Sequence, residues 1–236
     1  MNVALGKVRR DRLMTLSIGG SIVAPDGIDV LYLKRLRALM AAEVRRGYRF
    51  LIAIGGGALA RELQTAARAA GVRSETDLHW IGIGAVNVNS LVVQKALGRL
   101  ADPRLYPAAR PPARLRAPIT MFVPSRPGRS TDTGAVRLAM HFHAATLFNL
   151  TNINYVYTKD PKRFSDAKPL RFLRWPAYWK LIPRRVTPGL QTPFDPVASR
   201  LAAAAGVQVV VLNGRNLKNV KRALDGRPFR GTVIRG

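Results

Sequence analysis

The sequence predicts an α/β protein, a three-layer α/β/α sandwich in which helices cover both faces of a mostly parallel central sheet. Two observations support this fold class. Apolar residues switch repeatedly between strand-like and helical spacing, and short apolar strands alternate with the helices along the chain. The 236 residues are 47% hydrophobic and 22% charged, which is globular composition. This length suits one substantial domain, so we predict a single domain over residues 1–236.

The first half of the chain begins with two short apolar runs that are typical of buried strands: 13–18, followed by Gly19-Gly20-Ser21, and 50–54, followed by Gly55-Gly56-Gly57. Between them, residues 29–46 carry apolar side chains at helical spacing, with arginines on the opposite face. An alanine-rich helix after the second glycine run extends to Ala70 and is closed by Gly71. We expect the remaining elements of this half to be a helix over 83–100, a strand over 119–123 and a helix over 132–143.

The second half repeats the alternation, with a strand over 145–150, a helix over 194–205, a strand over 207–212 and a last helix over 215–224. Two proline-rich, basic segments interrupt the pattern, over 103–131 and 161–193. We interpret both as excursions over the active face and as candidates for contact with polyanions. In the second segment Trp175, Tyr178 and Trp179 favour a helix that packs its apolar side onto the domain.

The composition excludes several classes of protein. There is no cysteine, so disulfides, iron–sulfur clusters and thiolate zinc sites are ruled out. No apolar run reaches the roughly 18 residues that a membrane-spanning helix needs, and the N-terminus lacks the apolar stretch of a secretion signal. We therefore expect a soluble, cytoplasmic protein with no membrane partner.

The charge balance is strongly basic. Lys and Arg number 39 against 13 Asp and Glu, which gives a net charge of +26. Such a field attracts polyanions, so non-specific contact with nucleic acid through a basic surface is one interpretation. The other is a compositional bias toward arginine that selects no partner. The sequence leaves both open.

The two glycine runs indicate where the chemistry takes place. Each follows an apolar strand and precedes a helix, and ligands of parallel sheets bind beyond the carboxyl ends of the strands. Glycine lets the backbone approach a ligand closely, and the N-terminus of the next helix offers free N–H groups to phosphate. Neither run fits the P-loop or the GxGxxG pattern. Together they predict a phosphate-handling site.

Two later loops add candidate groups. The loop 125–132 combines arginines with hydroxyls and a probable helix cap, which makes it a third anion candidate or, alternatively, a capped turn with exposed arginines. The loop 151–161 offers amides, aromatic rings and a carboxylate, which suit a base and its ribose but also occur in ordinary polar loops.

The order and spacing of these motifs resemble the uridylate kinases of the amino acid kinase superfamily, nearer to archaeal-type enzymes and their relatives in small-genome bacteria than to the common bacterial type. The resemblance runs from about residue 13 to residue 234. The segments that carry it are 18–21, 55–61, 80–83 with Asn89, 127–128, 130–132, Thr151-Asn152, 157–161, 193–196, 213–216, Gly226 and 231–234.

This resemblance implies the amino acid kinase-like fold and transfer of a phosphoryl group from ATP to UMP, with Mg²⁺ held mainly by the nucleotide phosphates and no metal site made by the protein. It implies an acceptor-binding half over about 1–145 and an ATP-binding half over about 146–236. Asp195 and Arg61 would be catalytic. The implied ATP-binding residues are Gly19, Gly20, Ser21, Gly57, Arg61, Thr151, Asn152, Tyr157 and Asp160. The implied UMP-binding residues are Gly56, His79, Asn89, Ser125, Arg126, Pro127, Gly128, Arg129, Ser130 and Thr131.

The chain departs from the family pattern mainly around the acceptor. His79 stands where a carboxylate usually contacts the UMP ribose, and Val86-Asn87 replace a usual Thr-Arg. Asn154 stands where Asp is usual, and Ser17 where many members of the superfamily keep Lys. The alternatives are therefore a kinase for a different small acceptor, or a non-catalytic nucleotide- or RNA-binding paralogue. The resemblance also implies a homo-oligomer, a hexamer packed through helices near the N-terminal half.

Overall fold

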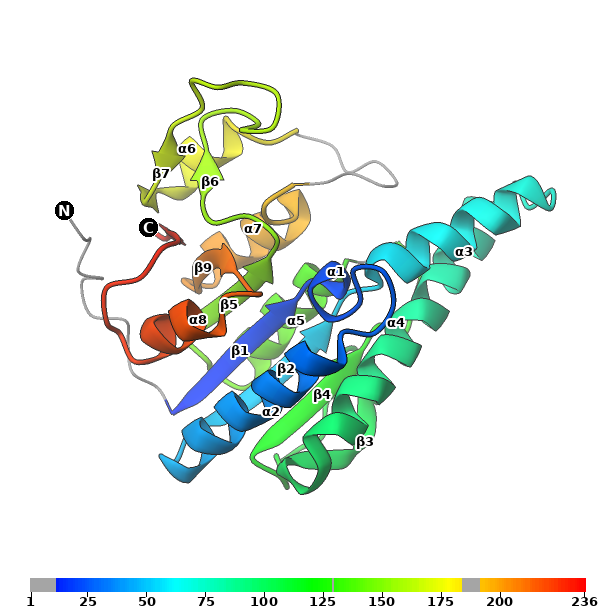
Figure 1. The fold of residues 1–236 in the computed structure, drawn as a ribbon, viewed down its shortest axis with the longest axis horizontal. Coiled ribbons are helices and arrows are strands. Elements are labelled where there is room, and N and C mark those ends of the chain that lie inside the picture. Colours follow the sequence, from blue (N-terminus) through cyan, green and yellow to red (C-terminus); the bar gives the residue numbers. More distant parts are fainter. Residues whose placement is uncertain (1–11, 129, 184–191) are drawn as a thin grey trace.

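The computed structural model describes residues 12–128, 130–183 and 192–236 of the chain, and it is built around one sheet (Figure 1). The strands lie in the order β3 (Ala101–Pro107), β4 (Ile119–Val123), β2 (Arg49–Ile54), β1 (Leu13–Ile18), β5 (Thr146–Thr151), β9 (Gln208–Asn213), β10 (Thr232–Ile234) and β8 (Phe172–Leu173). The strands from β3 to β9 are parallel, whereas β10 runs antiparallel to β9 and β8 is parallel to β10. The predicted mostly parallel sheet is confirmed.

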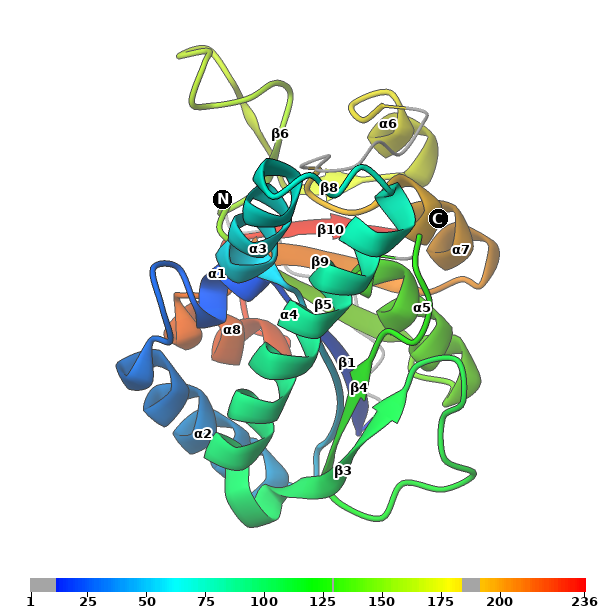
Figure 2. The ribbon, with the colours of Figure 1, turned by 90° about the vertical axis from the view of Figure 1, so that its right-hand side faces the viewer.

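Helices cover both faces of the sheet, as predicted (Figures 1 and 2). One face is covered by α2 (Val30–Arg45), α4 (Glu75–Leu97) and α8 (Leu217–Leu224), and the other by α5 (Thr131–His141), α6 (Trp175–Trp179) and α7 (Pro196–Ala204). The alternation of side chains along the strands supplies both cores: in β2, Phe50, Ile52 and Ile54 face the first set of helices and Ala53 faces the second. The aromatic cluster does form a helix packed on the domain, because Trp175 and Tyr178 are buried.

The remaining elements are short or project from the sheet. They are α1 (Gly20–Val23), α3 (Gly57–Ala69), the 3₁₀ helix η1 (Gly98–Leu100), and a two-stranded sheet of β6 (Val156–Tyr157) and β7 (Pro169–Leu170). Helix α3 and the N-terminal part of α4 extend together beyond the sheet (Figure 1). No residue of α3 is buried. Among the described residues, no helix is both long and apolar enough to cross a bilayer.

Two predicted elements are wrong in extent. Helix α4 begins at Glu75 rather than near 83, because Ser74 caps it by accepting a hydrogen bond from the Asp77 N–H at 3.2 Å, and the helix continues through Gly82 and Gly84. The segment 103–131, interpreted as a loop excursion, begins with strand β3. This strand tolerates its prolines because it lies at the edge of the sheet, where no further strand needs their missing N–H groups.

Candidate active site

The carboxyl ends of the parallel strands bring the predicted loops to one edge of the sheet. Strands β1 and β2 end at the two glycine runs, β4 leads into the loop 124–130, and β5 and β9 end at Thr151 and Asn213. Hydrogen bonds tie neighbouring ends together: the Gly19 N–H donates to the Leu150 carbonyl at 2.9 Å, and the Gly55 N–H to the Ile18 carbonyl at 2.8 Å. This edge is where ligands of parallel sheets bind.

The two glycine runs touch each other. A Cβ atom on Gly20 would lie 2.3 Å from the Gly57 nitrogen, and one on Gly57 would lie 2.4 Å from the Gly20 carbonyl carbon. Gly57 also has a φ of +62°, a conformation that side chains rarely adopt. Because no side chain fits between them, two stretches of backbone at the starts of α1 and α3 lie side by side. Free N–H groups at such positions attract phosphate.

Asn89 holds the second glycine run from below. Its side chain is buried, and its Nδ2 donates to the carbonyl oxygens of Gly55 and Gly56 at 3.1 Å each. The packing continues at Val86, because a Cβ on Gly56 would lie 3.5 Å from the Val86 Cγ2. Val86 is therefore part of the core under this loop, whereas Asn87 is exposed.

Asp195 lies at the centre of a hydrogen-bond network that joins three elements. It is the N-cap of α7, and its Oδ1 accepts from the Ala198 N–H at 2.7 Å and from the Thr133 hydroxyl at 3.3 Å. Its own N–H donates to Asp132 Oδ2 at 3.3 Å, and the Ser17 hydroxyl donates to Asp132 Oδ1 at 2.7 Å. Strand β1, helix α5 and helix α7 thus meet at two carboxylates.

Asp132 was not among the predicted site residues, although the motif 130–132 contains it. Burial raises the pKa of Asp132 to about 6, and the nearby Asp195 charge adds to the rise, while the bonds from Ser17 and from the Asp195 N–H oppose it. The hydroxyl of Ser17 is thus the side-chain partner of this carboxyl. The position of Asp132 just after the Ser130 cap was the available signal, but its partner is 115 residues away.

The loop 124–130, called the acceptor loop because the family resemblance predicts that it binds UMP, is less enclosed. Ser130 caps α5 by accepting from the Thr133 N–H at 3.0 Å, and it donates to the Thr133 hydroxyl at 3.1 Å. Ser125 is half-buried, whereas Arg126 and Gly128 are exposed. Arg129 lies outside the described residues. The structure therefore links one end of this loop, through Thr133, to Asp195.

Two predicted residues lie on the projecting helices. Arg61 is exposed in the second turn of α3, and His79 is half-buried near the start of α4. The helices are joined at this level by Gln64, whose Nε2 donates to the Leu78 carbonyl at 2.8 Å. Both side chains therefore lie on elements that begin or pass beside the second glycine run.

The residues predicted to hold the ATP base and ribose lie on, or at the base of, a separate excursion, residues 152–170, which rises from the sheet (Figure 1). Tyr157 is half-buried in β6, and its ring contacts that of Tyr155 edge-on with centroids 6.2 Å apart. Asp160 is exposed, and its Oδ1 accepts from the Lys162 N–H at 2.9 Å. At the base of the excursion, Thr151 Oγ1 accepts from the Ile153 N–H at 3.2 Å, and Asn152 is exposed. No hydrogen bond among the described residues links Tyr157 or Asp160 to the glycine runs.

Comparison with known proteins matches this arrangement to one family. The amino acid kinase family matches residues 119–213. A uridylate kinase from Haloquadratum walsbyi is 31% identical over 225 residues, covering 94% of this chain and 92% of the relative. A uridylate kinase from Methanothrix thermoacetophila is 32% identical over 227 residues, covering 94% of this chain and 99% of the relative.

Solved structures agree. The uridylate kinase of Archaeoglobus fulgidus superimposes with a TM-score of 0.78 at 25% identity, over 94% of this chain and 99% of that one. The UMP kinase of Bacillus anthracis superimposes with a TM-score of 0.79 at 20% identity, over 95% and 96%, which supports the fold. The similarity therefore extends over both halves of the chain.

Proposed function

Because this chain belongs to the uridylate kinases of the amino acid kinase family, we propose that it transfers the γ-phosphoryl group of ATP to UMP, giving ADP and UDP. The observation that carries the proposal is the contact between the two glycine runs at the edge where Asp195 also lies. Phosphoryl transfer needs little covalent work from a protein, only in-line positioning and stabilisation of spreading charge. Adjacent backbone N–H groups at two helix starts can supply both.

The reaction divides between the two sides of this edge. An oxygen of the UMP 5′-phosphate forms a bond to the γ-phosphorus of ATP, the bond from that phosphorus to the bridging oxygen breaks, and ADP leaves with the electron pair. The ATP phosphates are held by Gly19, Gly20, Ser21 and Gly57, and Arg61 supplies cationic charge from α3. Asp195 orients the groups around the transferring phosphoryl, and Asp132 positions Asp195 by accepting a hydrogen bond from its backbone N–H.

The two nucleosides are held by different segments. The acceptor-binding half, about 1–145, holds UMP between Gly56, His79 and the loop 125–131, with Asn89 acting indirectly by bracing the glycine carbonyls. The ATP-binding half, about 146–236, holds the base and ribose of ATP with Thr151, Asn152, Tyr157 and Asp160. A ring nitrogen of His79 accepts a hydrogen bond from a ribose hydroxyl, without the fixed negative charge that a carboxylate would supply.

The donor set fits a magnesium ion held mainly by the nucleotide phosphates. Among the described residues, no group of three or more His, Cys, Asp or Glu side chains could hold a metal. Both bonds that the described residues make to the Asp195 carboxylate reach Oδ1, so Oδ2 is the oxygen left for an ion. Mg²⁺ is typically bound by one or two carboxylates together with substrate phosphates. When bound, it would neutralise charge on the phosphates.

Exposed apolar residues on the projecting helices support a homo-oligomer. Leu63 of α3 and Trp80, Val88 and Leu91 of α4 are all at least 41% exposed, which is unusual for side chains of this size and typical of an interface. We expect copies of the chain to pack through these helices, and a hexamer is the state that the family resemblance implies. We place the enzyme in the cytoplasm, where its nucleotide substrates are found.

The test is a coupled assay with ATP, Mg²⁺ and a panel of nucleoside monophosphates, comparing the parent with Asp195→Asn. We expect UMP to be the preferred acceptor and the variant to lose about 100-fold or more in both kcat and kcat/KM, because the lost interaction acts in the transition state. Asn retains the cap on α7, so nucleotide binding by calorimetry should persist. Asp26→Asn, at an exposed position, is the matched control. Activity with another acceptor alone, or an unaltered rate in Asp195→Asn, would contradict the proposal.

A further inference from the structure

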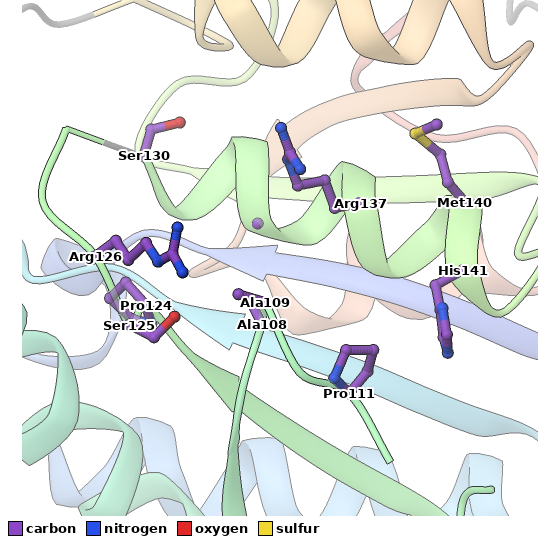
Figure 3. A pocket seen from close by; sticks show the side chains of 11 residues that line it. Ala108, Ala109, Pro111, Pro124, Ser125, Arg126, Ser130, Arg137, Met140 and His141 are labelled. Carbon is purple, nitrogen blue, oxygen red and sulfur yellow. The ribbon is translucent and has the colours of Figure 1, made fainter. Parts of the chain in front are cut away.

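A cavity lies beside helix α5 (Figure 3). It has a volume of about 590 Å³ and is bordered by residues after β3, by 124–126 and Ser130, and by helix α5. The described residues that line it include none from the two glycine runs. It reaches from Ser130 at the start of α5 to His141 at the end, and eleven helical residues span about 16 Å. The cavity therefore leads away from the two glycine runs.

The polar groups of this cavity suit an anion. Arg126, Arg137 and His141 line it, and no carboxylate does so among the described residues. Figure 3 shows Arg126 extending from the loop toward α5, where Arg137 lies. Guanidinium groups bind phosphate oxygens through paired, charge-assisted hydrogen bonds, and the Ser125 and Ser130 hydroxyls can add to them.

The rest of the wall is apolar. Met140, which is 42% exposed, lines it together with Pro111, Ala108 and Ala109. Ligand sites commonly combine a mostly apolar wall with a few convergent polar groups, in volumes of roughly 300–1,000 Å³. The apolar walls thus suit the base or sugar of a ligand, and the guanidinium groups of Arg126 and Arg137 suit the phosphate of the same ligand.

We propose that this cavity is a second binding site, for a phosphate ester of nucleotide size, and that its occupation weakens acceptor binding. The link is Arg126, which lies in the acceptor loop and also lines the cavity, so one guanidinium cannot serve both ligands fully. Arg137, Met140 and His141 belong to the cavity alone. The effect on the acceptor rests on the proposed function, whereas the binding site does not.

The test compares the parent, the double variant Arg137→Gln/His141→Gln and Arg99→Gln, an exposed arginine elsewhere, as the matched control. The probes are inorganic phosphate, ribose 5-phosphate and adenosine 3′-monophosphate, none of which carries a transferable γ-phosphoryl group. By calorimetry we expect the nucleotide to bind the parent and Arg99→Gln most tightly of the three probes. The double variant should bind it at least tenfold more weakly while keeping the parent's circular dichroism.

Kinetics test the link to the acceptor. The nucleotide probe should raise the KM for UMP in the parent and in Arg99→Gln but not in the double variant, whose KM without probe should equal the parent's. Equal probe affinity in the parent and the double variant would overturn the site. Equal affinity for all three probes would overturn the assigned ligand class. Calorimetry needs no turnover. Absence of kinase activity would therefore contradict the proposed function, while binding at the cavity could still be measured.

Discussion

The phosphoryl centre and the donor excursion are built in opposite ways. The phosphoryl centre, comprising the two glycine runs with Ser17, Asp132 and Asp195, is interlocked by backbone contact and by hydrogen bonds between distant elements. The donor excursion, residues 152–170, is mostly exposed and is held by a two-stranded sheet of two residues per strand. Phosphoryl transfer needs fixed geometry, whereas a base and a ribose can be held by side chains that change conformation on binding. We expect substitutions that separate the two glycine runs to disrupt folding and catalysis together, and those in the excursion to change affinity alone.

The largest effect should come from Gly57→Ala. Its Cβ would lie 2.4 Å from the Gly20 backbone, and Ala tolerates a φ of +62° poorly, so the two glycine runs must separate. We expect at least about a hundredfold loss of kcat/KM, since a displacement of about 1 Å at a positioning site can cost that much. Urea denaturation should show a loss of about 1–3 kcal/mol, as for other overpacked sites.

Gly84→Ala provides the control for that substitution. Gly84 lies in α4, and outside its own helix backbone no atom lies within 4 Å of an added Cβ, so alanine should raise helix stability by up to about 1 kcal/mol and leave the contact between the glycine runs intact. If Gly57→Ala behaved like Gly84→Ala, the contact between the glycine runs would have no role in positioning phosphate.

A second prediction concerns the pH dependence of stability at Asp132. Its folded-state pKa of about 6 lies above the unfolded value of 3.8, so the folded protein binds more protons between these values and its stability falls as pH rises through this window. The fall should amount to up to about 3 kcal/mol. In Asp132→Asn this part of the slope should vanish.

The measurement is the urea midpoint at several pH values from about 4 to 7, for the parent, Asp132→Asn and Asp26→Asn, an exposed carboxylate as control. Parallel curves for the parent and Asp132→Asn would show that the carboxyl of Asp132 is not enclosed as the network with Ser17 and Asp195 requires. The phosphoryl centre would then be more open than the comparison with the excursion assumes.

Asp160→Ala tests the excursion. Asp160 is exposed and caps a local turn, so its loss should leave the stability of the fold nearly unchanged. If it holds the ATP nucleoside, ATP binding should weaken by about 1.5–3 kcal/mol, the cost of a hydrogen bond to a charged group, while UMP binding stays constant. Calorimetry with each nucleotide separately measures both. Equal weakening for ATP and UMP would indicate that the excursion supports the whole domain.

Local patterns in the sequence predicted most of the sheet. Strands β1 and β4 have the bounds that their apolar runs indicated, because a parallel strand buried on both faces is apolar over nearly its whole length. Strands β8 and β10 were missed because each contains only two or three residues, and their pairing depends on the fold around them. The predicted start of helix α4 lies too far along the chain, because Gly82 and Gly84 are weak helix formers. The signal for its true start was the N-cap Ser74.

The candidate site, like the sheet, could be predicted only in part. The glycine runs could be found from the sequence, since a strand, a glycine run and a helix are neighbours in the chain. The role of Asp132 could not, because it depends on hydrogen bonds to Ser17 and Asp195 that only the folded chain creates. That Asn89 contacts UMP stays a prediction from its motif, whereas its hydrogen bonds to the Gly55 and Gly56 carbonyls became visible only in the folded chain.

The smallest effect is expected in a third region, the basic segment after the start of β3. Arg104, Arg110, Arg114 and Arg116 are exposed there and lie outside the phosphoryl centre and the donor excursion. Replacing all four by Gln should leave kinase activity unchanged. RNA binding should be weak in parent and variant alike at about 0.15 M salt, where the Debye length is about 8 Å and exposed charges are screened.

The salt dependence of RNA binding decides whether that basic segment has a function of its own. Each phosphate that an arginine neutralises on a single strand contributes a slope of about −0.7 to the logarithm of affinity against the logarithm of salt. If the net charge of +26 is only compositional, the variant and the parent should share one shallow slope. A steep slope in the parent that flattens by about 2–3 in the variant would instead identify these arginines as an RNA-binding face. Fluorescence anisotropy with a labelled single-stranded RNA at several salt concentrations measures the slope directly. The control is a second variant in which Gln replaces Arg35, Arg73, Arg99 and Arg222, which are exposed on other surfaces. Its net charge equals that of the first variant, so the pair shows whether the position of the arginines or the total charge determines RNA binding.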